Sequence, residues 1–300
     1  GEIDFGGNAK HLAFVLKSAG SPATVPVLVS MLSRGAVDEA SLNDVLDVIA
    51  SFGRPEDLQS LLNLAIASRD DSITHRYLHA LLEAHRRRKA LPAGSRNGLT
   101  RRCTNAAPAV TATAARLIGA WKWADGRTWL AARALAGGEP AETRLAAIDG
   151  LATFGGEEAA QQLVTLAKDD VDPQVRRAAL VGLLALKPQV SARLTAAFLQ
   201  QVTEPAAATP LIEAYVSRPN VADVLAEALQ TDAAAGKSIA ADVAVVALRT
   251  VRASGRQFPA LEAALARAGG VSTEPVQLSP EEMEQLVAQI LAEGDPQRGE

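Results

Sequence analysis

A segment of about 31 residues recurs along the chain, and this repetition limits the folds that the sequence can adopt. In three stretches a glycine is followed four residues later by a bulky apolar residue. The glycines are Gly119, Gly150 and Gly182, so the steps are 31 and 32 residues. Each stretch is followed by a break and a second apolar segment. One helix pair cannot bury its apolar side alone, so this period is typical of stacked helical repeats.

The apolar residues inside the repeats are spaced as in amphipathic helices. In the segment 41–53, Leu42, Val45, Leu46 and Ile49 follow the i, i+3, i+4, i+7 spacing. The composition agrees, because the 300 residues include 60 Ala and 37 Leu while aromatic residues make up only 4%. Such a balance favours closely packed helices over sheets. The sequence therefore predicts an all-α, right-handed solenoid of about eight helix pairs.

Two segments interrupt the repeat array, which we expect to occupy residues 1–268. Residues 91–108 contain few apolar residues and many turn formers, so we predict an irregular basic connection there. Residues 269–280 are predicted to be a linker. Residues 281–300 are predicted to hold a terminal amphipathic helix and the segment that follows it, because Met283 and Val287 belong to one apolar face.

The breaks between helices carry residues that begin and end helices. Asp172 is followed by a proline, which predicts an N-cap and a first helical turn. Gly53, Gly155 and Gly255 lie where a left-handed residue would end a helix. The run from Asp172 to Arg176 also resembles the turn and second-helix start of a HEAT repeat. This resemblance implies a HEAT-like α-α superhelix.

A basic segment from His75 to Arg102 is the most pronounced charge feature. It holds eight Lys or Arg and one acid, Glu83, so its net charge is +7; because the whole chain carries −4, the remainder carries −11. Three interpretations stay open: a solvated helix end and loop, a docking surface for an acidic protein face, and a nucleic-acid surface. Nucleic acid is disfavoured because Tyr77 is the only aromatic residue in this window. The candidate partner-binding residues are Arg86, Arg87, Arg88, Lys89, Arg101 and Arg102.

The histidines of this segment allow one metal hypothesis. His75 and His79 are four residues apart on a predicted helix, a spacing that can present two imidazoles to one ion, and His85 lies further along. A bound zinc ion needs a third and usually a fourth ligand, and we find no acidic or cysteine ligand with matching spacing. Packed or solvated histidines are therefore the preferred interpretation, and no metal or cofactor site is expected.

The remaining reactive and aromatic side chains do not form a catalytic set. Cys103 follows two arginines, which could lower its pKa, but no histidine base is defined for it. Trp121, Trp123 and Trp129 are predicted to pack in the core or between repeats, with a contact site for a neighbouring domain as the alternative. We therefore expect this chain not to be an enzyme. No apolar run reaches the length of about 18 residues that a membrane span requires.

The C-terminal sequence is similar to one family of multidomain proteins. Residues 277–300 (QLSPEEMEQLVAQILAEGDPQRGE) resemble the segment before the cytochrome c domain in PVC-type membrane-bound dehydrogenases, also called c-type haem-binding domain proteins. In that family a helix ends in a Gly-Asp-Pro-x-Arg-Gly-Glu run, here Gly294 to Glu300. Residues 19–32, 53–67 and 210–229 are similar to the family's middle region.

This resemblance implies a context for the chain. Such proteins place a propeller-type dehydrogenase domain before the helical repeats and a c-type cytochrome domain after them, in the periplasm or cell envelope. Haem c would be held by the cytochrome domain, because this chain has no CxxCH motif. The chain would then be a non-catalytic scaffold from an oxidoreductase, with the flanking domains as its partners. The alternative is an independent HEAT-like module that binds a protein or peptide through the basic segment.

Overall fold

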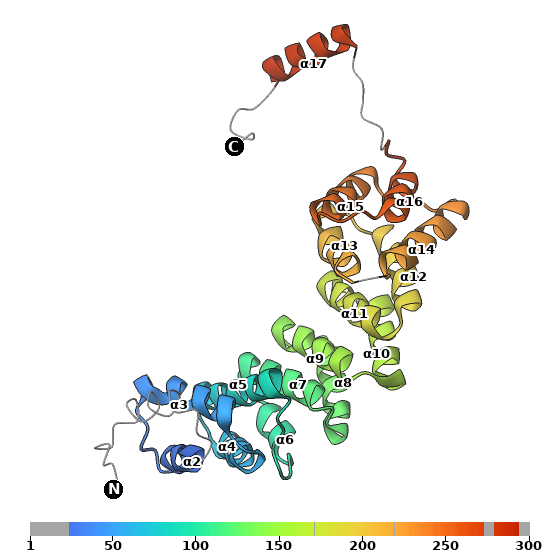
Figure 1. Ribbon diagram of the computed structural model, residues 1–300. Coiled ribbons are helices and arrows are strands. Elements are labelled where there is room, and N and C mark those ends of the chain that lie inside the picture. Colours follow the sequence, from blue (N-terminus) through green and yellow to red (C-terminus); the bar gives the residue numbers. More distant parts are fainter. Residues whose placement is uncertain (1–23, 171, 219, 273–278, 294–300) are drawn as a thin grey trace. The chain divides into compact units, whose positions relative to one another are not determined.

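The computed structural model describes residues 24–170, 172–218, 220–272 and 279–293 (Figure 1). These residues form sixteen α-helices and two short 3-10 helices, and they contain no β-strand. The helices pack against one another in succession along the chain. The predicted all-α, HEAT-like solenoid is therefore confirmed.

The chain divides into two compact units, residues 1–197 and 198–300. The boundary lies near the end of α12 (Pro188–Leu199) and inside the range that we expected as one array. Beyond α12 the chain runs through a turn into the 3-10 helix η3 (Pro205–Ala208), which packs on two helices of unit 2, α13 and α15. The connection from α12 to α13 thus consists of a turn and a 3-10 helix.

In unit 1 the helices alternate between two layers. The odd layer contains α3 (Glu39–Phe52), α5 (Asp71–Arg88), α7 (Pro108–Ala120), α9 (Ala141–Phe154) and α11 (Pro173–Leu186). The even layer contains α2 (Val25–Ser33), α4 (Pro55–Ala67), α6 (Leu99–Cys103), α8 (Arg127–Leu135, preceded by η2, Ala124–Gly126) and α10 (Gly156–Asp169). Within unit 1, each odd helix packs on a neighbouring odd helix and on an even helix, so the core lies between the layers.

Unit 2 has a similar paired arrangement. It contains α13 (Thr209–Val216), α14 (Ala222–Ala234), α15 (Ala241–Ala253), α16 (Pro259–Gly269) and α17 (Pro280–Glu293). Helix α13 packs on α15, α14 packs on α16, and α15 packs on α16. Helix α17 begins at Pro280 and otherwise lies in the segment 281–300, where the sequence predicts a terminal helix.

The residues that begin and end the helices partly follow the sequence expectation. Asp172 is the N-cap of α11, and its carboxylate accepts a hydrogen bond from the main-chain N–H of Gln174. Gly155 and Gly255 have φ angles of 77° and 69°, as left-handed positions require. The expectation for Gly53 is wrong, because its φ is −59°. A Cβ at Gly53 would instead lie 2.5 Å from the carbonyl oxygen of Ile49, so space explains this glycine.

The recurring glycines lie where neighbouring odd helices approach closely, and at Gly119 and Gly150 the contact is with backbone atoms. A Cβ added to Gly119 of α7 would lie 2.3 Å from the carbonyl oxygen of Gly150 in α9. A Cβ added to Gly150 would lie 2.6 Å from the carbonyl oxygen of Ala115. Gly182 of α11 is less crowded, since its Cβ would lie 3.1 Å from the Cβ of Ala152. The period of the glycines is therefore the period of close helix contact.

A second periodic feature joins each odd helix to the even helix before it. The fourth residue of α7, α9 and α11 is Thr111, Arg144 and Arg176, respectively. Each donates a hydrogen bond to a carbonyl in the last turn of the preceding even helix: Thr111 to Cys103 at 2.9 Å, Arg144 to Ala134 at 3.1 Å and Arg176 to Ala167 at 3.2 Å. Carbonyls at helix ends have no partner within their own helix, so these side chains satisfy them.

Arg144 also joins its repeat to the following one. Its guanidinium is almost fully buried and forms an ion pair with Asp170, the C-cap residue of α10. Burial alone would raise the pKa of Asp170, but the hydrogen bonds from Arg144 and from the Asp172 main chain hold this pKa below its usual value. The junctions on both sides of α9 thus depend on one side chain.

We predict that Gly150→Ala destabilises unit 1. Alanine favours a helix by up to about 1 kcal/mol over glycine, but its methyl group would meet the backbone of Ala115, which no rotamer change can relieve. The expected net loss is about 1–3 kcal/mol in the free energy of unfolding. Denaturant unfolding followed by circular dichroism measures it. Gly138→Ala is the control, because nothing lies within 4 Å of its added Cβ; equal stability of the two variants would contradict the close contact.

Candidate functional site

The basic residues at the end of α5 mostly make contacts within the protein. The Arg88 guanidinium donates to the carbonyls of Ala50, at 3.1 Å, and of Gly53, at 2.9 Å, at the carboxyl end of α3. Burial lowers the pKa of Arg88, because a desolvated guanidinium is less easily charged. Arg88 therefore caps a neighbouring helix.

The next two arginines are paired with carboxylates. Arg87 lies 2.7 Å from Asp47 of α3 and 3.4 Å from Glu83, one turn earlier in α5. Arg86 lies 3.0 Å from the other oxygen of Glu83. The Asp47 hydrogen bond raises the pKa of Arg87, and the charge of Glu83 adds to this. These pairs offset much of the positive charge that the sequence concentrates here.

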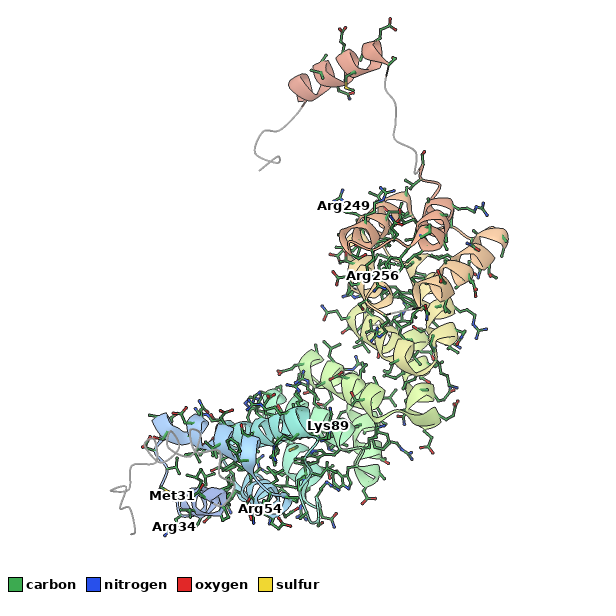
Figure 2. The ribbon with its side chains drawn as sticks, viewed as in Figure 1. Met31, Arg34, Arg54, Lys89, Arg249 and Arg256 are labelled. Atoms are coloured by element: carbon green, nitrogen blue, oxygen red, sulfur yellow. The ribbon has the colours of Figure 1, made fainter. Side chains whose placement is uncertain are left out.

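Lys89 and Arg101 are the two candidate residues that are both exposed and unpaired among the described residues. Lys89, labelled in Figure 2, is the C-cap of α5, has a left-handed backbone with φ of 57°, and is exposed. Arg101 is exposed on α6. In the described part of the chain, neither side chain has a hydrogen bond or ion pair. They are the free cations that the basic segment offers to a partner.

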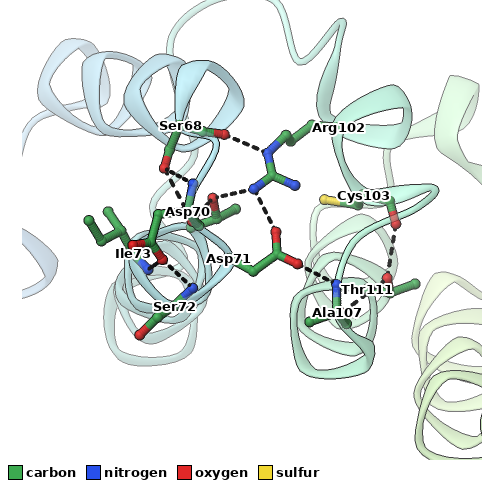
Figure 3. A network of polar contacts seen from close by, with 10 residues as sticks. Ser68, Asp70, Asp71, Ser72, Ile73, Arg102, Cys103, Ala107 and Thr111 are labelled. Atoms are coloured by element: carbon green, nitrogen blue, oxygen red, sulfur yellow. Dashed lines mark hydrogen bonds and ion pairs between the residues drawn. The ribbon is translucent and has the colours of Figure 1, made fainter.

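Arg102 lies at the centre of a network that ties α6 to α5 (Figure 3). Its Nε donates to the Ser68 carbonyl at 2.7 Å, and its Nη2 donates to Asp71 at 2.7 Å and to the Thr74 hydroxyl at 2.8 Å. Asp71 also accepts from the main-chain N–H of Ala107 at 2.6 Å. The Ala107 hydrogen bond and Arg102 together hold the pKa of Asp71 below its usual value.

This network supplies a hydrogen-bond donor at one junction between repeats where the fourth residue of the odd helix does not. Thr74 is the fourth residue of α5, the position that Arg144 occupies in α9, but its short side chain donates to its own N-cap carbonyl, at Asp70, and not to α4. Arg102 reaches from α6 to the carbonyl at the end of α4 instead. Four of the six candidate contact residues therefore have roles inside the fold.

The segment 91–108 is ordered by contacts with α4. The N–H of Ala93 donates to the Pro55 carbonyl at 3.0 Å. The side chain of Gln59 bonds to the main chain of Gly94 and Ser95, both at 2.9 Å. Helix α6 then buries Leu99 and Cys103 completely. The connection thus includes a short helix of the even layer.

Burial sets the chemistry of Cys103. The thiol has no solvent-exposed surface, and its desolvation raises its pKa to about 12, which outweighs the opposing charge of Arg102. The expected lowering by the neighbouring arginines is therefore wrong. A thiolate is the reactive form of cysteine, so this side chain acts as a small apolar group of the core.

The two histidines of α5 lie beside a groove between α3 and α5. The ring centroids of His75 and His79 are 6.2 Å apart, and the rings are tilted by 51°. Asn43 and Asp47 line the α3 side of this groove, whose volume is about 460 Å³. Burial lowers the pKa of His75, with a contribution from the charge of His79, and this favours the neutral imidazole. Across the described residues, no three His, Cys, Asp or Glu side chains converge as a metal site would require.

The three tryptophans pack within unit 1. Trp121 is buried, with the guanidinium of Arg96 5.5 Å from its ring centroid. The indole N–H of Trp129 donates to the Thr104 hydroxyl at 3.1 Å. Trp123 is partly exposed and directly precedes η2. The indoles of Trp121 and Trp129 thus join α7 and α8 to the segment 91–108.

A second groove, between α13 and α15, was not recognised from the sequence. It has a volume of about 610 Å³, and Arg249 and Arg256 line it (Figure 2). Arg256 donates to the Val216 carbonyl at 3.0 Å and lies 5.3 Å from the ring centroid of Phe258. The signal was present as three arginines within residues 249–256, in a unit that is otherwise acidic.

Paired helices in two layers, joined at a regular period, define an α-helical repeat protein. Residues 97–184 match the family model of HEAT repeats, so the chain contains a HEAT-repeat region. Neither a curated protein nor a solved structure matches the chain. HEAT repeats form helical scaffolds and mediate protein interactions. None of the described helices combines the length and apolar content that a bilayer crossing requires.

We predict that Arg102→Ala destabilises unit 1 and that Arg101→Ala does not. The first change removes three hydrogen bonds from a mostly buried guanidinium and leaves the Ser68 carbonyl without this donor. The expected loss is about 2–3 kcal/mol in the free energy of unfolding. Removing the exposed Arg101 should change it by less than about 0.5 kcal/mol. Thermal unfolding of both variants measures this, and similar losses would contradict the structural role of Arg102.

Proposed function

We propose that this chain is a non-catalytic scaffold that holds other domains of a multidomain protein at a set separation. The observation that carries the proposal is the odd layer of unit 1, in which α3, α5, α7, α9 and α11 pack one on the next. Helices α7 and α9 touch through their backbones, and a buried hydrogen bond from Arg144 joins α9 to α8; such contacts resist bending better than exposed side-chain contacts do.

Further support comes from where the polar side chains are used. The arginines of the repeat junctions satisfy helix carbonyls, the single thiol is buried, and the histidine pair lacks a third ligand among the described residues. The described residues thus use their polar groups to join repeats. This use of polar groups suits a spacer, because its role depends on firm junctions between repeats and requires no reacting group.

The finer proposal is that the scaffold comes from a PVC-type membrane-bound dehydrogenase of the periplasm or cell envelope. There it would position a propeller-type dehydrogenase domain and a c-type cytochrome domain that holds haem c. The support is the sequence resemblance of residues 277–300, of which 277–278 and 294–300 lie outside the described residues. Substrate oxidation would belong to the propeller domain and electron acceptance to the haem.

The longer reading frame tests this proposal. We expect a CxxCH motif within some tens of residues after Glu300 and a β-rich domain before Gly1. In that full-length protein, deleting residues 279–293 should change the rate of haem reduction by substrate, measured by stopped-flow absorbance. Substrate oxidation with a soluble dye as acceptor should be unchanged. An unchanged rate of haem reduction would contradict the positioning role.

A second function, binding of an acidic protein face, is favoured by one observation. Lys89 and Arg101 are exposed cations, and no described residue pairs with either side chain. Arg86 is exposed next to them but is paired with Glu83. Under this alternative the basic segment makes the contact, and the binding is salt-sensitive because exposed charges are screened.

The alternative predicts that Lys89→Glu/Arg101→Glu weakens binding of an acidic peptide, such as a fluorescent poly-glutamate probe, by about ten-fold or more at low salt. Fluorescence anisotropy measures this affinity. Arg34→Glu, which reverses an exposed charge at the C-cap of α2, outside the basic segment, is the control. Equal affinity of both variants, or no measurable binding to wild type, would contradict this alternative.

A further inference from the structure

We propose that α17 docks along the groove between α13 and α15 of its own chain, as an intramolecular strap on unit 2. This inference concerns the chain alone and does not depend on the dehydrogenase context. It rests on the chemistry of the groove, the chemistry of α17 and the length of chain between them.

The groove has a mostly apolar lining and a basic edge. Val216, Val246 and Ala253 are its apolar lining residues. Arg249 and Arg256 are exposed at its edge. Arg256 uses one nitrogen for the Val216 carbonyl, while Arg249 has no hydrogen bond or ion pair in the described part of the chain.

Three of the four hydroxyl groups that line the groove already donate to main-chain carbonyls, among them Ser217 to Ala214. Thr250 donates to the Val246 carbonyl and Ser254 donates to the Val251 carbonyl, each within α15. The arginines are therefore the main donors that face an incoming ligand, and Glu213 is the one acid of the lining. An occupant with an apolar face and acidic flanks fits this arrangement.

Helix α17 has both of these properties. Met283 and Val287 lie on one face and are 48% and 49% exposed, respectively. The helix sequence contains four glutamates and no basic residue (Glu281, Glu282, Glu284 and Glu293). Every α17 side chain that the structure describes is exposed. Isolated helices of about 12–15 residues are marginal in water, so this helix of 14 residues needs a surface to cover its apolar side.

The segment that connects α16 to α17 is short enough to keep α17 near the groove and long enough to let it reach the groove. Gly269, at the end of α16, lies against Ala244 of α15, since its added Cβ would be 2.2 Å from the Ala244 Cβ. The groove begins at Val246 on the same helix. Residues 271–279 can extend over about 30 Å, more than the length of α15, which is about 20 Å. The tether keeps α17 near the groove at high effective concentration.

Charge disfavours the pairing of α17 with the same helix of a second copy. Two such helices would bring eight glutamates together with no basic residue on either. Like charges at close range repel, and the repulsion is strongest at low salt. The arginines of the groove remove this penalty, so the groove is a better cover for α17 than another α17.

Hydrogen exchange of the 300-residue chain, measured by mass spectrometry at low micromolar concentration, tests the proposal. Docking predicts that α17 amides exchange at least about ten-fold more slowly in wild type than in Met283→Glu/Val287→Glu. Gln285→Glu, on the opposite face of α17, is the matched control and should keep this protection. Wild-type α17 amides that exchange as fast as in an unstructured peptide would overturn the proposal.

The groove side is tested by charge reversal. Arg249→Glu should remove most of the protection of α17, and Glu284→Arg in the same chain should restore part of it. Arg267→Glu reverses an exposed charge on α16 outside the groove and should have no effect. Circular dichroism checks that each variant folds. Equal loss from Arg249→Glu and Arg267→Glu, or protection that disappears on dilution as a second copy would require, would overturn the intramolecular docking.

Discussion

The carbonyl groups at the end of each even helix are the constraint on which the junctions between repeats depend. These groups have no partner inside their own helix, and leaving one buried without a donor costs about 1–3 kcal/mol. Thr111, Arg144 and Arg176 supply the donors from the fourth position of the following odd helix. Where Thr74 is too short, Arg102 supplies the donor from α6. The ends of α4, α6, α8 and α10 are thereby fixed to the helices that follow them.

Regular features of the fold were predictable from the sequence, because they arise from local or periodic causes. Gly119, Gly150 and Gly182 recur since neighbouring helices approach closely at one point in each repeat, and the helices follow from apolar spacing. The contact between Arg102 and Ser68 joins residues 34 positions apart and follows no period. Thr111 and Arg144 both donate to a carbonyl at the end of the preceding even helix. Because their side chains differ, the sequence does not reveal that they occupy equivalent positions. Such features depend on tertiary proximity.

The basic segment shows what the sequence could not indicate about the candidate site. Net charge counts side chains but does not say where they point. Arg88 and Arg102 point toward helix carbonyls, and Arg87 is held between two carboxylates. Cys103 is a similar case, because the two arginines before it suggest a reactive thiol while its complete burial makes it inert. In both cases desolvation and pairing outweigh the effect of neighbours in the sequence.

The backbone contact between α7 and α9 has a mechanical consequence. Side chains can change rotamer and absorb a shift of one helix against another, but main-chain atoms at Gly119 and Gly150 have no such freedom. The angle at this joint is thus fixed by the polypeptide itself. Substitutions on the outer surfaces of either helix would leave the angle between the two helices unchanged. A force applied along the repeats would be transmitted at this contact without a shift of one helix against the other.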